Sequence, residues 1–127
     1  MKYICKTGKT IEQATADLQT AVVKHGFGVL HIHNLKQTLQ NKGVEMNEDC
    51  LVFEVCNPHQ AKKVLEADMS MNMALPCRIS VYSEKGQNYI GMISPASMLG
   101  MLSESDALKT VAAEVEEQSI KMINDAV

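Results

Sequence analysis

The sequence predicts one α+β domain over residues 1–127, in which an antiparallel or mixed sheet is covered mainly on one face by helices. Two observations carry this prediction. Several short runs alternate apolar and polar residues, as strands with one buried face do. Two long segments, 10–25 and 105–125, each carry a single apolar stripe at helical spacing. A helix of this kind has to bury its stripe, so each of the two needs a sheet face to cover.

The first half of the chain is predicted to alternate strands and helices. Thr10 has the position of a helix N-cap, and Gly26 that of a helix stop. The other elements expected in this half are strands over 2–6 and 27–33 and a short helix over 35–42.

The second half begins with a strand over 51–56 that leads directly into a helix. Asn57 as the N-cap and Pro58 at the first helical position form a strong start signal. The remaining elements expected are strands over 77–82 and 88–93 joined by a tight turn, a short helix from Ser94-Pro95, and a last helix from Ser103 or Ser105.

The composition excludes several classes of protein. The net charge is −3 and Arg78 is the only arginine, with no run of basic residues. Nucleic-acid binding is therefore not expected, because neutralising phosphates requires a basic surface. No apolar run approaches the ~20 residues that span a bilayer, and the start lacks the pattern of a signal peptide, so we expect a cytoplasmic protein that does not bind membranes. The four cysteines form no CxxC pair and are expected to be reduced thiols: Cys5, Cys50, Cys56 and Cys77.

Three stretches of the chain resemble the domain-of-unknown-function 302 family. They are HGFGVL at 25–30 with TL at 38–39, VCNP at 55–58, and LPCRISVY at 75–82 followed by Pro95 and Met98-Leu99. The resemblance implies an α+β fold similar to the TATA-binding-protein-like class and a homodimer, and it implies no activity. It marks five residues as candidates for importance: Cys56, Asn57, Pro58, Pro76 and Cys77.

Two cysteines are candidate catalytic residues. Cys56 precedes a helix start, where the positive end of the helix dipole favours a thiolate, and this predicts a nucleophile or redox thiol. The alternative is a small buried residue at a strand end. Cys77 begins the next strand and could lie nearby. However, Cys56 alternates with the polar Glu54, whereas Cys77 alternates with Ile79, so the two thiols are expected on opposite faces of the sheet.

The polar face of the sheet is the leading candidate for a ligand site. Arg78, Ser80 and Tyr82 share one face of a strand, and a single guanidinium held on a strand suits carboxylate or phosphate recognition. The alternative is an ordinary surface ion pair between Arg78 and Glu54. The ligand-binding residues predicted on this face are His31, His33, Glu54, Arg78 and Tyr82.

Two patterns are typical of metal sites, although we expect neither a metal nor a cofactor. His31 and His33 form half of a possible metal site, and the alternative is a solvent-facing pair with Leu30 and Ile32 pointing to the other side. The segment 69–73 reads M-x-M-x-M, which suits copper(I). The alternative is a loop that packs alternate methionines on the core.

The leading hypothesis is therefore a homodimeric binding or interaction domain with a small anionic ligand on its polar sheet face. The runner-up is a thiol-dependent enzyme or redox sensor centred on Cys56, and a third possibility is a soft-metal binder.

Overall fold

The computed structural model describes residues 1–127. Its centre is one five-stranded sheet in the order β1-β5-β4-β3-β2, with every neighbouring pair antiparallel. The strands are β1 (Lys2–Thr7), β2 (Gly28–Asn34), β3 (Cys50–Cys56), β4 (Cys77–Glu84) and β5 (Gln87–Ile93). The predicted α+β class is thus confirmed.

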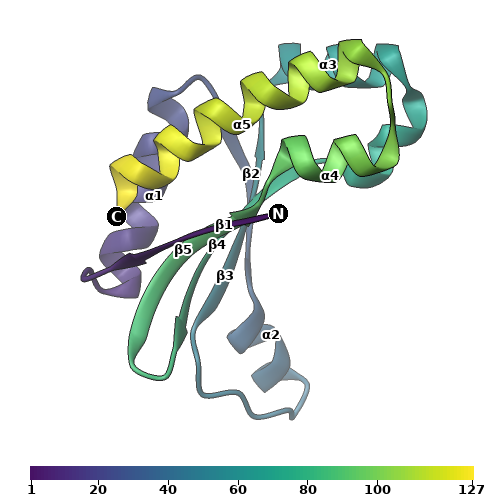
Figure 1. The fold of residues 1–127 in the computed structure, drawn as a ribbon. Helices are drawn as coiled ribbons and strands as arrows, with labels where there is room; N and C mark the ends of the chain where they lie inside the picture. Colours follow the sequence, from purple (N-terminus) through teal and green to yellow (C-terminus); the bar gives the residue numbers. More distant parts are fainter.

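The long helix α5 (Asp106–Ala126) organises the helical layer and crosses the sheet diagonally (Figure 1). It contacts three other helices: α1 (Ile11–Lys24), α3 (Pro58–Ala67) and α4 (Pro95–Leu102). A fourth helix, α2 (Leu35–Asn41), lies away from them at the opposite end of the sheet (Figure 1). None of the helices combines the length and apolar character needed to cross a membrane.

The predicted helix starts are confirmed, because side-chain oxygens accept hydrogen bonds from the first backbone N–H groups. Thr10 accepts from the N–H of Gln13, and Asn57 accepts from those of His59 and Gln60. Ser94 and Ser105 cap α4 and α5 in the same way. These caps fix where each helix leaves the sheet.

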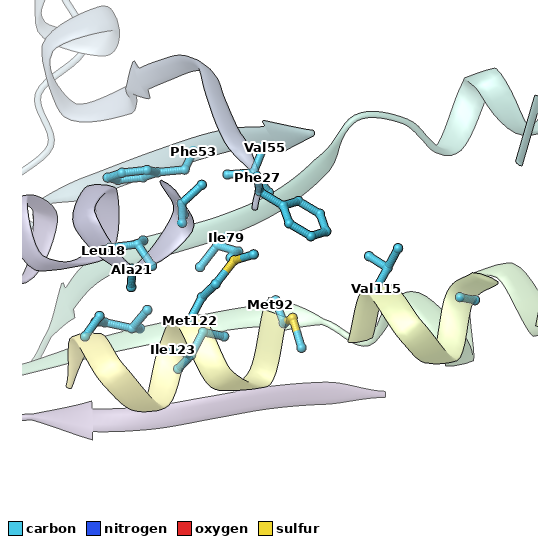
Figure 2. Packing of buried hydrophobic residues seen from close by; sticks show 14 of the residues in the cluster. Leu18, Ala21, Phe27, Phe53, Val55, Ile79, Met92, Val115, Met122 and Ile123 are labelled. Atoms are coloured by element: carbon cyan, nitrogen blue, oxygen red, sulfur yellow. The ribbon is translucent and has the colours of Figure 1, made fainter. Parts of the chain in front are cut away.

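The hydrophobic core lies between the helical layer and one face of the sheet (Figure 2). Phe53 and Ile79 enter it from β3 and β4, while Leu18 and Met122 enter it from α1 and α5. All four are at most 1% exposed. The opposite face of the sheet carries no helix layer, and we call it the open face.

Two details differ from the sequence-based expectation. The register of β2 against β3 shifts between Val29 and His31, so Leu30 is 61% exposed instead of pointing inward with Ile32. This bulge interrupts the alternation on which the expectation rested. The M-x-M-x-M segment is a 3₁₀ helix, η1 (Met69–Ala74), and only Met71 of its methionines is buried.

Candidate functional site

A hollow opens where β4 and β5 separate. Their pairing ends at Ser80 and Gly91, although β4 begins at Cys77 and β5 continues to Ile93. Beyond that point the two strands no longer hydrogen-bond to each other, and the space has a volume of about 490 Å³. The hollow therefore opens at a gap in the sheet, and neighbouring segments complete its walls.

The walls of the hollow come from three parts of the fold. The open face contributes polar and apolar side chains, including Lys2, Ile4 and Ser80. Apolar walls come from η1, from Pro76 after it and from the first turn of α4: Met73, Ala74, Pro76, Pro95 and Met98. Residues that face the core form the depth of the hollow: Cys77, Ile79, Met92 and Ser119.

Arg78 lies on the wall of this hollow with its guanidinium free. The side chain is exposed and takes part in no hydrogen bond or ion pair within the chain. The ammonium group of Lys2, on the edge strand β1, also has no carboxylate partner. Two unpaired cations thus border one hollow, which suits an anion.

Glu54 is the cross-strand neighbour of Arg78, but its carboxylate binds elsewhere. Nε2 of His33 lies 2.6 Å from Oε1 of Glu54. The hydrogen bond from His33 lowers the pKa of Glu54, and the charges of His33, Arg78 and His31 add to this effect. Glu54 therefore stays ionised and provides negative charge beside the hollow without closing onto Arg78.

Tyr82 forms the wall at the far end of the hollow from Arg78. Its ring stacks on Tyr89, with 5.2 Å between the ring centroids. Burial raises the pKa of Tyr82, and the nearby Glu84 adds to the rise. The phenol is therefore neutral at physiological pH and can donate a hydrogen bond.

All five predicted ligand-binding residues lie on the open face, as strand parity predicted. Only Arg78 and Tyr82 line the hollow, while His31, His33 and Glu54 lie beside it. Sequence reasoning missed Lys2 and the walls from η1 and α4. Lys2, Ile4 and Lys6 are the exposed residues of β1, and this alternation with less exposed residues is typical of an edge strand. Nothing local in the sequence indicates that this strand pairs with β5.

The comparisons with known proteins agree with this fold. The family model of the domain of unknown function DUF302 matches residues 3–126. The chain belongs to the DUF302 family. It is similar to a solved structure described as an uncharacterized conserved protein DUF302 from Bacillus stearothermophilus, with 30% identity and a TM-score of 0.93. That match covers 99% of this chain and 98% of the other. No curated protein matches the sequence.

Some of the residues that suggested the DUF302 family lie around a second, smaller cavity of about 270 Å³ on the core side of the sheet. Cys56, Asn57, Pro76 and Cys77 line it, and Pro76 and Cys77 also line the hollow on the open face. Asn57 caps α3, as described above, and its amide also donates to the carbonyl of Gly26. The motif VCNP thus joins β3, α3 and the turn after α1.

The two candidate catalytic cysteines of this DUF302 chain line the same cavity as free thiols. Cys77 faces the core beside its cross-strand partner Val55, as parity predicted. Cys56, at the end of β3, reaches the same cavity, so the expected separation of the two thiols by the sheet is wrong at this point. Burial raises the pKa of Cys77 to about 11, and the nearby Cys56 adds to the rise. Cys77 is therefore a protonated thiol at neutral pH.

The candidate metal ligands are a histidine pair on β2 and the methionines of η1. The rings of His31 and His33 contact edge to face, with centroids 4.4 Å apart, but no three His, Cys, Asp or Glu side chains are grouped so that they could hold a metal ion. Met69 and Met73 are 67% and 81% exposed, and Met71 is buried on the other side of η1.

Proposed function

We propose that this DUF302 domain binds a small anionic ligand with an apolar portion, in the hollow between the separated ends of β4 and β5. The observation that carries the proposal is the free guanidinium of Arg78 on the wall of that hollow. The natural competitor for Arg78 is Glu54, directly across the strand pair, and Glu54 is bound by His33 instead.

The charge of the site favours a carboxylate or a phosphate ester. Arg78 offers a planar fork of N–H donors that suits two anionic oxygens at once, and Lys2 adds a second positive charge at the same hollow. The neutral phenol of Tyr82 and the hydroxyl of Ser80 can donate to the ligand without repelling it. The anion would thus replace its hydrogen bonds to water by contacts with side chains that have no other partner in the chain.

The apolar walls of the hollow favour an apolar group on the rest of the ligand. Met73, Pro95 and Met98 face the same space as Arg78, and methionine side chains adapt to ligands of irregular shape. A volume of about 490 Å³ lies within the range of small-molecule sites. The ligand is therefore expected to be amphipathic, with its anionic end at Arg78 and its apolar end toward α4.

The test is titration of the protein with benzoate and phenyl phosphate, followed by two-dimensional NMR. We expect shifts at residues lining the hollow, and Arg78→Lys should weaken binding about tenfold, because charge-assisted hydrogen bonds are worth about 1.5–3 kcal/mol. Lys63→Gln is the charge control, since Lys63 is an exposed residue of α3 away from the hollow. Equal weakening by both variants would show only a general charge effect and would overturn the proposal.

A second candidate is thiol chemistry at Cys56. It is favoured by the position of Cys56 between β3 and the capped start of α3, next to a cavity. Reactive cysteines of thiol enzymes often lie at the start of a helix.

A further inference from the structure

The smaller cavity lies on the core side of the sheet, bordered by α3, α5 and the adjoining ends of β3 and β4, and it is about as open to solvent as the hollow. Phe27 and Val115 point toward one another from its two sides, with Val55 beside Phe27 (Figure 2). It shares only Pro76 and Cys77 with the hollow on the open face. We call it the inner cavity.

The lining of the inner cavity contains no charged side chain. Most of it is aliphatic, with Val64, Leu65 and Leu75 among its walls. The amide of Asn57 is already occupied by the cap of α3 and by the carbonyl of Gly26. The raised pKa of Cys77 is a further sign of a poorly hydrated environment, because it is caused mainly by burial. An ion would lose its hydration in this cavity and find no opposite charge.

One polar atom in the lining has no partner. Nε2 of Gln60 donates to Oε2 of Glu114 at 3.0 Å, which identifies the nitrogen and oxygen ends of the amide. The other end of the same amide, Oε1, is buried and accepts no hydrogen bond. Buried acceptors are rarely left without a donor, since the loss costs about 1–3 kcal/mol. Gln60 lines the inner cavity, so a molecule bound there can supply the missing donor after a small turn of the amide.

We infer that the inner cavity is a second ligand site, and that it takes a small uncharged molecule with an apolar body and one hydroxyl or amine donor for Gln60. Apolar cavities of about 150 Å³ have room for benzene, so a cavity of about 270 Å³ has room for a substituted ring. The inference does not depend on the anion site, because the two sites share only Pro76 and Cys77 and would bind ligands of different charge.

Three probes of similar shape test the ligand class: benzyl alcohol, toluene and benzoate. Binding is followed by NMR through the methyl groups of Val55, Val64 and Val115. We expect benzyl alcohol to bind about threefold to tenfold more tightly than toluene, which is the contribution of one neutral hydrogen bond. Benzoate should leave these methyl groups unshifted. Absence of shifts with benzyl alcohol, or equal affinity for toluene, would overturn the inference and indicate a dry or water-filled packing defect.

Variants locate the site. Gln60→Met keeps the length of the side chain and removes the acceptor, so it should abolish the preference for benzyl alcohol over toluene. Ala112→Leu should fill the cavity and abolish binding of both, and Ala61→Leu on the half-buried rim serves if Ala112→Leu fails to fold. Ala113→Leu, on the exposed side of α5, is the matched control.

Arg78→Lys separates the two sites. It should leave the affinity for benzyl alcohol unchanged, even if the anion site proves wrong. Loss of benzyl alcohol binding in Arg78→Lys, or its retention in both cavity-filling variants, would place the probe elsewhere and overturn the inference.

Discussion

Nε2 of His33 lies 2.6 Å from Oε1 of Glu54, and this contact leaves Arg78, the cross-strand neighbour of Glu54, without a carboxylate partner. A strand pair with opposite charges directly across from each other normally forms its own ion pair. Here His33, on the third adjacent strand β2, forms the competing contact with Glu54. The free guanidinium of Arg78 is therefore a consequence of three adjacent strands and not of one residue.

The first prediction concerns the acid titration of Glu54. Replacing His33 by alanine should raise the pKa of Glu54 toward its ordinary value of 4.5, because the hydrogen bond from His33 is the largest cause of the lowering. A group with a lowered pKa in the folded state stabilises the protein above its unfolded pKa and loses this effect as the pH falls through its folded pKa. The advantage of wild type over His33→Ala should therefore begin to decline near pH 4.5 and disappear as the pH falls through the lowered pKa of Glu54.

Carbon NMR of the carboxylate measures this pKa directly. His31→Ala is the control, since His31 acts on Glu54 only through its charge and is the smallest of the contributions. We expect a smaller rise in that variant. Equal shifts in the two variants would show that the 2.6 Å contact between His33 and Glu54 is not formed in solution.

The second prediction separates the cysteines by reactivity. Burial raises the pKa of both Cys50 and Cys77, the latter to about 11, so their thiolates are scarce at neutral pH. Cys56, beside the start of α3, should react faster than either with iodoacetamide at pH 7.5. Mass spectrometry of peptides after short exposure gives the order. Cys56→Ser is the control for misassignment, and slower reaction of Cys56 than of Cys50 would remove the thiol-dependent candidate.

Much of the fold follows from local sequence signals. The caps at Thr10 and Asn57 and the alternation in β3 and β4 are properties of neighbouring residues, and these were predicted correctly. The hairpin of β4 and β5 was also predicted correctly from its turn sequence. In the structure, Lys85 and Gly86 adopt the positive φ angles that its two-residue turn requires.

The hollow could be predicted only in part. Arg78 and Tyr82 were placed by parity within one strand, which is local information. The end of pairing at Ser80 and Gly91 has no local signal in the sequence. It depends on β1, because β5 remains paired with β1 up to Ile93 after its pairing with β4 has ended. The exposure of Leu30 was missed for a similar reason, since a bulge depends on the partner strand.

The third prediction concerns assembly. We expect a homodimer that buries the apolar side chains exposed on η1 and α4, two elements in contact with each other. Met69, Met101 and Leu102 are between 56% and 74% exposed, which is a large apolar surface for an isolated chain. Met101→Glu should shift the dimer toward monomer, whereas Val23→Glu, at an exposed apolar position on α1, should not. A wild-type mass near 14.0 kDa by sedimentation at micromolar concentration would contradict this prediction.

The last prediction concerns Gly91, where β1 and β5 approach closely beside the hollow. A Cβ added at this position would lie 2.9 Å from Cγ1 of Ile4 and 3.1 Å from the carbonyl oxygen of Tyr3. Both distances are shorter than ordinary contacts, so β1 would have to move. Gly91→Ala should therefore destabilise the protein by about 1–3 kcal/mol, as overpacking does.

A double variant and a second glycine make this result specific. Ile4→Ala removes Cγ1 and should restore part of the stability of Gly91→Ala, but not all of it, because the backbone of Tyr3 remains close. Gly100→Ala, in α4 with nothing within 4 Å of the added carbon, should be neutral or stabilise by up to about 1 kcal/mol. Urea unfolding of the four variants gives these values. If Gly91→Ala is as stable as Gly100→Ala, β1 does not lie as close to β5 in solution, and the wall that Ile4 and Lys2 form beside Arg78 is not fixed.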